Sequence, residues 1–425
     1  MKPSSTPNSI SDPQAGWIWL RLCLLPGAVI GSLYGWAMLV STAVHPGWVG
    51  LNHIALGTDW MVFYGAIRSV LDGNLPLLMN GDDFTAYLNS SMAEWLSVPL
   101  AFRPWFYPPT FLVFLLPFAP LGFAGSYYAF QALSAGFLAT SLAKGAGNTA
   151  ARYVAAAVLL SPAASLNLID GQCAFLVAAL FVTGVRLLER RPVLAGAVLG
   201  LLTFKPQFCL LVPLALLGSR QWRSLIAAAC SACALAAVSA MIFGLDIWAW
   251  WIPRAIENLV SPDQKWVSYG RIWGHSVWAC ARLLGAPERL ASMLQFAAIA
   301  TGAAAVFVAF RSSLGKDKQL AVLLAATVLA APHSGPYDAT LLVAAVALWL
   351  AANAGQQPSF RDWILGLGIW MVPLLSPPVY VVTGRFAPLL TVVLIGLILN
   401  EIRQPKASSE SGDRMAGSPI GVTAG

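Results

Sequence analysis

The chain consists of long apolar runs separated by short polar segments. Each run is a helix candidate, because closed barrels and helices alone satisfy the backbone hydrogen bonds inside a bilayer and these runs do not alternate as strands do. Several are shorter than the roughly 20 residues of an upright span, so they must tilt or extend into flanking residues. The runs lie at 17–44, 107–143, 153–169, 172–185, 192–204, 206–219, 224–245, 290–310, 319–337, 339–360, 363–384 and 386–400. The pattern predicts an all-α integral membrane protein.

Composition strengthens this prediction and excludes an ordinary soluble enzyme. Of 425 residues, 58% are hydrophobic and 10% are charged, whereas soluble domains carry about 25% charged residues. The net charge is +7, but the basic residues are scattered between apolar runs and form no stripe, so we expect membrane lipids and no nucleic acid as partners. The six cysteines lie mostly inside apolar runs, which favours neither a metal site nor disulfides.

The positions of the basic residues predict the topology. With the N-terminus in the cytoplasm, most Lys and Arg fall in cytoplasmic loops if the run 107–143 crosses once and adds a short re-entrant piece. This gives about 12 crossings with both termini cytoplasmic. We expect a cytoplasmic tail at 1–16, a transmembrane domain at 17–402, and a cytoplasmic disordered tail at 403–425.

Two large loops, 45–106 and 246–289, then lie on the extracytoplasmic side. In the first loop, aromatic and aliphatic residues recur every three or four positions over 58–71 and again over 83–96, which predicts two amphipathic interfacial helices. The aromatic and proline-rich segment 102–109 leads into the next membrane segment. Any chemistry of this protein is therefore expected outside the cytoplasm.

Polar residues at the outward turns are the candidate functional groups. Lys205, followed by the helix breaker Pro206, is either a phosphate-binding point charge or a turn lysine that snorkels to the surface. Asp59 is either a general base or an acid that complements a helix dipole. His333 is either substrate-facing or structural, Asp338 is also a plausible helix cap, and Gln172 is also a plausible first residue of a helix.

The order of these motifs resembles glycosyltransferase family 87. That family comprises integral-membrane GT-C transferases similar to polyprenol-phosphate-mannose-dependent mannosyltransferases. The resemblance covers residues 59 to 338 and departs at Asp59-Trp60, where the family commonly has Asp-Phe. The matching motifs are Asp59-x-x-x-Phe63-Tyr64-x-Ala66, Leu71-x-Gly73, Tyr107-Pro-Pro109, Gly171-Gln172, Ala195-Gly196-x-x-x-Gly200 with Lys205-Pro206, and Pro332-His333-x-x-x-Tyr337-Asp338.

The resemblance implies a polytopic GT-C-type bundle in a bacterial inner (cytoplasmic) membrane, with an extracytoplasmic active site. It implies that a hexose, expected to be mannose, is transferred with inversion from a polyprenyl-phosphate-sugar donor to a lipid or glycan acceptor. Asp59 takes the position of the general base, and His333 is the second expected catalytic residue. The expected substrate-binding residues are Lys205, Arg103, Tyr64, Gln172, Tyr337 and Asp338.

A flippase or transporter of lipid-linked sugars is the alternative function. It predicts ionisable residues at mid-membrane depth and inverted repeats, neither of which is clear in this sequence. A polymerase or ligase that transfers whole glycans would share the outward site. No Asp-x-Asp metal motif and no Gly-rich phosphate loop occurs, so we expect no cofactor, and dependence on a divalent cation stays open.

Overall fold

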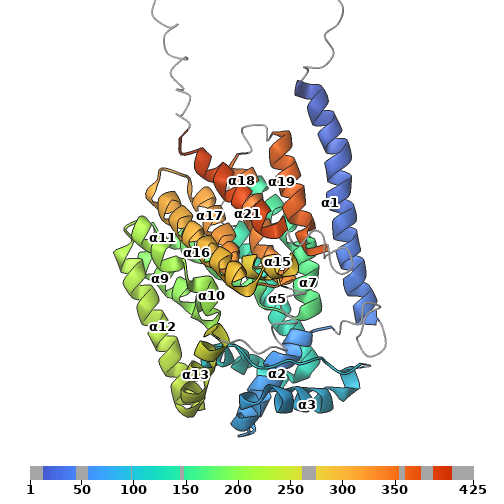
Figure 1. Ribbon diagram of the computed structural model, residues 1–425, viewed down its shortest axis with the longest axis vertical. Helices are drawn as coiled ribbons and strands as arrows, with labels where there is room; N and C mark the ends of the chain where they lie inside the picture. The colour runs from blue at the N-terminus through green and yellow to red at the C-terminus, as the bar shows by residue number, and fades with distance from the viewer. Residues whose placement is uncertain are drawn as a thin grey trace, which may run out of the picture.

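The structure is a computed structural model that describes residues 13–44, 56–96, 98–143, 148–260, 274–353, 359–374 and 386–403. Within these ranges every regular element is a helix, in agreement with the predicted all-α class. The longer helices form one bundle, and the shorter helices α2, α3 and α13 lie across its lower end in Figure 1.

Three helices form the centre of the bundle because they are apolar on nearly every face. α8 (Ala174–Leu187), α17 (Lys316–Ala330) and α18 (Ala339–Ala352) bury almost all of their side chains. Such helices belong inside a bundle. α17 packs against α18, and both contact α8. The charged residues of α8 and α17 lie only in the last turn of α8 and the first turns of α17, so the charge of these helices is confined to one end of the core.

Helices with a lipid-like outer face surround this core. α5 (Gly122–Ala143) packs on α8, α16 (Glu288–Arg311) packs on α17, and α12 (Trp222–Phe243) packs on α9 (Pro192–Gly200). Their outward faces expose large apolar side chains, with Met241 85% and Phe296 71% accessible. Apolar surface on this scale is stable only against an apolar solvent or partner, as expected for a protein in a bilayer.

Three or four segments of the described residues could cross a membrane, judged by their length and composition. Three segments are long and apolar enough to cross: Pro109–Ala143, α12 and α16. The pair Ala151–Leu159 and Pro162–Asp170, bent by 50°, would be a fourth crossing if it is one span. Further apolar segments of 10–17 residues occur in the described ranges, among them Ala28–Ala43 within the 32-residue helix Pro13–Val44, and the expected number of about 12 crossings stays a prediction.

The segment 107–143 contains a short apolar piece followed by a long helix, and the re-entrant or interfacial character of the short piece stays a prediction. α4 (Pro109–Leu115) and the 3-10 helix η4 (Leu116–Leu121) form a short apolar piece, and α5 follows with 22 residues. Gly122 separates them with φ of 68°, a left-handed conformation that glycine adopts without strain. The 22 residues of α5 are long enough for a full crossing, whereas the preceding piece is not.

Lys205 sits at the turn between two helical arms. α9 continues into η5 (Leu201–Phe204), and α10 (Pro206–Cys209) and α11 (Val212–Gly218) follow after the lysine. α9 packs on α12 and α11 packs on α16. The break at Lys205-Pro206 therefore places the lysine at the end of the arms and in contact range of the bundle centre.

The first loop folds into a compact layer. It contains α2 (Thr58–Leu71), η2 (Leu75–Met79), α3 (Gly81–Ser91) and η3 (Ala93–Trp95). α2 has the predicted bounds, but it is buried on most faces between α4, α5, α7 and η2, so it is a core element of this layer rather than a helix lying on the bilayer surface. The second predicted helix is interrupted at Met92.

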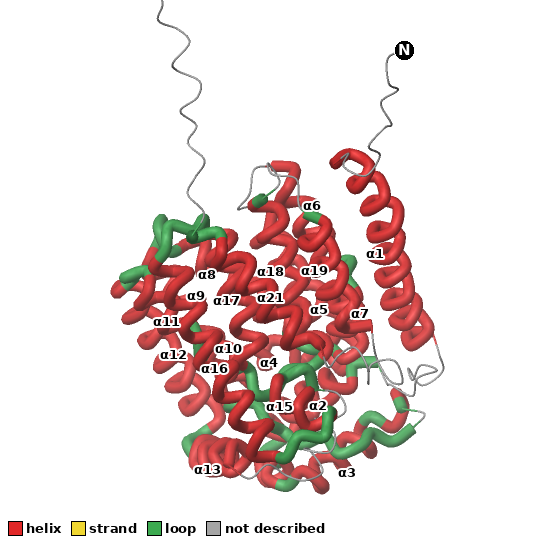
Figure 2. The backbone as a smooth tube through the Cα atoms, turned by 45° about the horizontal axis from the view of Figure 1, so that its top comes forward, coloured by secondary structure: helices red, strands yellow, loops and turns green. Residues whose placement is uncertain are grey.

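The remaining helices complete the bundle and the second loop. The first described residue of α1 and the last of α21 lie at the same end, opposite α2, α3 and α13 (Figures 1 and 2).

Predictions for 1–12, 45–55, 261–273 and 404–425 lie outside the described residues. The bounds are α1 (Pro13–Val44), α6 (Asn148–Leu159), α7 (Pro162–Asp170), α13 (Asp246–Val260), α15 (Val277–Leu283), η6 (Pro336–Asp338), α19 (Phe360–Met371), η7 (Val372–Leu374) and α21 (Ala387–Asn400).

Ion pairs connect the loops at the end where α21 stops. We call these side chains the Arg186 cluster: Arg186 with Asp317 at 3.2 Å, Lys316 with Glu189 at 3.1 Å, and Lys318 with Glu401. The cluster joins the end of α8, the start of α17 and the end of α21. Three of the loops that the basic residues predicted to be cytoplasmic therefore share one end of the bundle.

Candidate active site

Two glycines fix the start of α2 against the turn between α7 and α8. Gly57 and Gly171 have φ of 71° and 72°, and the Gly57 amide donates a hydrogen bond to the Ile169 carbonyl at 2.5 Å. A Cβ at Gly171 would lie 2.6 Å from the Cβ of Trp60, too close for any side chain. The sequence therefore permits a backbone approach that brings Asp59 next to Gln172.

Trp60 anchors the same helix from its other side. Its indole N–H donates to the Ser126 hydroxyl at 2.8 Å, and its ring packs on Phe130 with centroids 4.7 Å apart. The side chain is 1% exposed. Because buried aromatic packing allows few rotamers, the backbone that carries Asp59 is held rigidly.

Asp59 is the centre of a polar chain that crosses three elements. The Gln172 amide nitrogen donates to Asp59 Oδ2 at 2.6 Å. The Gln172 amide oxygen in turn accepts from the Tyr107 hydroxyl at 3.2 Å and from the Cys173 backbone N–H at 3.2 Å. These bonds assign the orientation of the amide, so its N–H group points at the carboxylate.

A second layer of amides holds Gln172 in place. Gln131 Nε2 donates to the Gln172 carbonyl at 3.0 Å, and Asn167 Nδ2 donates to Gln131 Oε1 at 3.0 Å. Asn167 Oδ1 accepts from the Ala174 N–H at 3.0 Å, at the start of α8. Gln131 and Asn167 are buried in apolar helices, where fully satisfied polar groups give rigidity and a single arrangement.

The environment of Asp59 makes it a stronger base than an ordinary aspartate. Burial raises the pKa of its carboxyl group, and the charge of Asp338 acts in the same direction. Arg103, the Gln172 hydrogen bond and Lys205 oppose the shift without cancelling it. A carboxylate with a raised pKa binds a proton more readily, which is the property that general-base catalysis requires.

Lys205 and Asp338 form a buried ion pair. Lys205 Nζ lies 2.8 Å from Asp338 Oδ1, and the two side chains are 3% and 2% exposed. Asp338 Oδ2 also accepts from the Gly335 N–H at 2.9 Å. Lys205 therefore does not snorkel to the surface, and the Asp338 side chain makes no capping hydrogen bond to α18. The structure therefore excludes the snorkelling alternative for Lys205 and the α18-cap alternative for Asp338.

Aromatic and charged groups surround this ion pair. The Lys205 ammonium lies 4.5 Å from the centroid of Phe208 and 5.4 Å from that of Tyr337. Asp59 is close enough to Lys205 and Arg103 for their charges to act on its pKa. We call the group formed by Asp59, Tyr107, Gln172, Lys205 and Asp338 the Asp59 cluster.

Two of the expected site residues have no described contact with this cluster. His333 lies in the turn after α17 and is exposed, and no hydrogen bond of its side chain is found within the described residues. The Tyr64 ring packs edge-to-face on Phe123, with centroids 6.1 Å apart. The roles of both residues remain predictions, as do the roles of the other expected site residues.

Some members of the site were not singled out from the sequence. The Tyr107 hydroxyl, which burial keeps in the protonated donor form by raising its pKa, was noted only as part of an aromatic motif. Gln131 and Asn167 were missed altogether. The available signal was the presence of uncharged amides inside apolar runs, which in membrane proteins mark hydrogen-bonded interior positions.

The acids and histidines of the site do not form a metal cage. No group of three or more His, Cys, Asp or Glu side chains that could hold a metal ion occurs among the residues that the structure describes. Asp170, at the end of α7, lies close enough to Asp59 to feel its charge but does not join such a group. The arrangement consists of one carboxylate with a raised pKa, the amides that support it, and two nearby cations.

A helical bundle with a lipid-facing surface and a buried acid at one end defines a membrane-embedded protein with an enzyme-like site. The family model described as Glycosyltransferase family 87 matches residues 105–332, more than half of the chain. The chain therefore belongs to glycosyltransferase family 87 and is a membrane glycosyltransferase. Neither a curated protein nor a solved structure matches it.

Proposed function

We propose that this glycosyltransferase moves a hexose, mannose in the first instance, from a polyprenyl-phosphate-sugar to a lipid or glycan acceptor on the extracytoplasmic face of the inner membrane. In this reaction an acceptor hydroxyl oxygen bonds to the anomeric carbon, and the bond from that carbon to the phosphate oxygen breaks. The hydroxyl proton passes to Asp59, and polyprenyl phosphate leaves with inversion at the anomeric carbon.

The arrangement around Asp59 is the observation that carries the proposal. The Asp59 side chain is half-buried, its carboxylate is held by Gln172 at 2.6 Å, and its pKa is raised by desolvation. Its other oxygen, Oδ1, accepts no hydrogen bond from any described residue, so it is available to an acceptor hydroxyl. A phosphate ester leaves as an anion already, so the reaction needs a base and no general acid.

The cations near Asp59 fit the donor's phosphate. Arg103 and Lys205 both act electrostatically on Asp59, and an acid and two cations in one site suit attack by a hydroxyl and departure of an anion. Lys205 shares its charge with Asp338, and both Lys205 and Arg103 are candidates for direct contact with the phosphate.

The position of the cluster favours a transferase over a flippase. Lys205, Gln172 and Asp338 lie in the turns between helices, at the end of the core that is opposite the Arg186 cluster. A flippase would require ionisable groups along a path at mid-membrane depth. The helix interiors of α8, α17 and α18 are apolar instead.

The decisive experiment measures transfer of radiolabelled mannose from polyprenyl-phosphate-mannose to a membrane lipid extract. Purified wild-type protein is compared with Asp59→Asn and with Asp317→Asn, a matched acid-to-amide change in the Arg186 cluster. We expect Asp59→Asn to lose about 100-fold or more of the rate and Asp317→Asn to stay near wild type.

Two outcomes would contradict the proposal. A fully active Asp59→Asn variant would remove Asp59 from the role of base. Absence of wild-type transfer from every polyprenyl-phosphate-hexose tested, with the folded state verified, would reject the donor class. Transfer of glucose or galactose in place of mannose would correct the sugar and keep the mechanism.

A further inference from the structure

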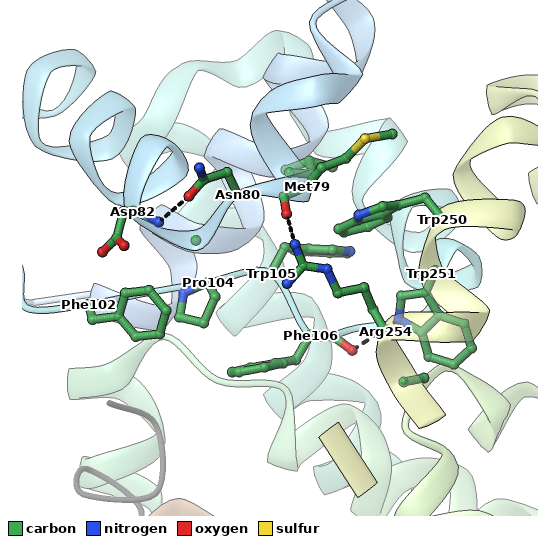
Figure 3. Close-up of a pocket in the computed structure, with 13 residues that line it drawn as sticks. Met79, Asn80, Asp82, Phe102, Pro104, Trp105, Phe106, Trp250, Trp251 and Arg254 are labelled. Atoms are coloured by element: carbon green, nitrogen blue, oxygen red, sulfur yellow. Dashed lines mark hydrogen bonds between the residues drawn. The ribbon is translucent and has the colours of Figure 1, made fainter. Parts of the chain in front are cut away.

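A pocket of about 250 Å³ lies between the first-loop layer and α13. Figure 3 shows its walls: the turn at Met79 and Asn80 on one side, the extended segment at Phe102–Phe106 below, and α13 with Trp250, Trp251 and Arg254 on the other side. None of these residues belongs to the Asp59 cluster. The pocket is thus a second concave site on the same face of the protein.

The pocket combines aromatic rings with planar polar groups. Trp105, Trp250 and Trp251 contribute indole rings, and Asn80 and Arg254 contribute amide and guanidinium groups. The Arg254 guanidinium reaches across to the Met79 carbonyl, and the Trp251 indole N–H donates to the Phe106 carbonyl at 3.2 Å. These two bonds connect α13 to the first loop and hold the pocket open.

Two of the indoles in the pocket wall turn ring carbon atoms, and not their N–H groups, toward the pocket. Trp105 and Trp250 line the pocket, but their Nε1 atoms are buried, and the Trp105 side chain is 4% exposed. The Trp248 indole on the same helix is not part of the lining, and its N–H donates to Ser239 at 3.0 Å. The lining therefore offers aromatic rings as a packing surface, with Asn80 and Arg254 as polar groups.

The pocket is one aromatic layer away from the Asp59 cluster. Trp105 lines the pocket and also packs on Tyr107, with centroids 5.8 Å apart, and Tyr107 bonds to Gln172. The same extended segment supplies Arg103, whose charge acts on Asp59. A molecule bound in the pocket would therefore have its next unit close to the base.

We propose that this pocket binds a neutral hexose unit of the acceptor glycan, an inference that rests on the proposed function. Aromatic faces pack on the C–H faces of a sugar ring, while amide and guanidinium groups match its hydroxyls. The volume is below the about 300–1,000 Å³ of sites for drug-sized ligands and suits one small ring. A phosphate is disfavoured because the exposed carboxylate Asp82 also lines the pocket.

Direct binding is measured by saturation-transfer NMR with methyl α-mannoside and full-length protein in nanodiscs. Trp250→Leu removes an aromatic ring from the pocket wall, and Arg254→Gln removes the guanidinium. Trp248→Leu is the matched control, because it removes an indole of α13 that does not line the pocket. We expect each pocket variant to bind methyl α-mannoside about threefold to tenfold more weakly than the wild type, and the control to bind it as the wild type does.

A kinetic arm separates the two sources of a hexose. If the pocket holds the acceptor, each pocket variant raises the acceptor KM by about the factor by which it weakens sugar binding. The donor KM then stays unchanged. A raised donor KM with an unchanged acceptor KM overturns the assignment to the acceptor. The sugar site itself is overturned if the wild-type protein gives no saturation transfer, or if the pocket variants bind as Trp248→Leu does.

Asp59→Asn distinguishes failure of this inference from failure of the proposed function. We expect this variant to bind methyl α-mannoside as the wild type does while losing transfer. Sugar binding with full transfer in Asp59→Asn would reject the base and keep the pocket. Loss of transfer without any sugar binding by the wild type would keep the base and reject the pocket.

Discussion

The two ends of the core helices carry charged clusters of opposite character. α8 and α17 have 14 and 15 residues, so about 20 Å of apolar helix separates the Arg186 cluster from the Asp59 cluster. In the Arg186 cluster the ion pairs keep contact with solvent: the side chains of Lys316 and Glu189 are 34% and 68% exposed. In the Asp59 cluster, Lys205 and Asp338 are 3% and 2% exposed.

The two clusters differ in the desolvation cost of their ion pairs. Exposed ion pairs contribute about 0–1 kcal/mol and connect loops at little cost, as the Arg186 cluster does. A buried pair must overcome desolvation and is weak evidence of stability, so its presence asks for another reason. Buried charges near an acid with a raised pKa are a pattern typical of functional sites.

Breaking the buried pair should give the largest effect on stability. Lys205→Met leaves the Asp338 carboxylate buried with only the Gly335 N–H as its remaining described partner, and we expect a loss of about 3–5 kcal/mol in the free energy of unfolding. Lys316→Met, in the Arg186 cluster, should cost about 0–1 kcal/mol. Denaturation of the purified proteins in detergent measures both.

A double variant sharpens this test. Lys205→Met with Asp338→Leu removes both charges and should recover most of the lost stability, because apolar replacements of a buried pair are often neutral. If the pair serves the reaction, transfer stays low in the double variant. Equal stability of Lys205→Met and Lys316→Met would mean that the two clusters do not differ in the way their burial indicates.

Removing the support of Asp59 should lower kcat with a smaller effect than removing the base. Gln172→Leu keeps the volume and deletes the 2.6 Å hydrogen bond to the carboxylate, so we expect kcat to fall about tenfold while the donor KM is unchanged. The Gln172 bond lowers the pKa of Asp59, so its loss should also move the acid limb of the pH profile to higher pH. An unchanged profile would reduce Gln172 to a structural residue.

The wild-type pH profile tests the burial of Asp59 directly. Burial raises the pKa of this carboxyl above the ordinary value of 3.8, so the base becomes protonated, and transfer falls, at a higher pH than for an exposed aspartate. The logarithm of kcat/KM against pH measures this limb. An acid limb at or below the ordinary value would show that burial does not raise the pKa of Asp59.

The smallest effect is expected in the Arg186 cluster. Glu189→Gln removes an exposed partner of Lys316, and we expect a change of about 0–1 kcal/mol in stability and no shift of the pH profile. The same transfer and denaturation assays serve here. A shifted pH profile would show that the two clusters communicate along α8 or α17.

Much of the architecture could be predicted from the sequence because apolar periodicity is a local property. The helix at 58–71 has the bounds that its spacing indicated. The burial of α2 could not be predicted, since it depends on α4, α5 and α7 packing around it. An amphipathic pattern shows that a helix has an apolar face but does not show what covers its other faces.

The sequence alone determined the solvent of this protein and the kinds of chemistry open to it: a bilayer, from a chain that is 58% hydrophobic, and a few polar turns with Asp59, Lys205 and Asp338. Only the tertiary structure decided which of the polar residues contact one another. Lys205 and Asp338 are 133 residues apart in the chain, and Gln172 and Asp59 are 113 apart, yet each pair is in hydrogen-bond contact. Composition and spacing report what each segment prefers, whereas desolvation and contact between distant turns depend on how the whole bundle closes.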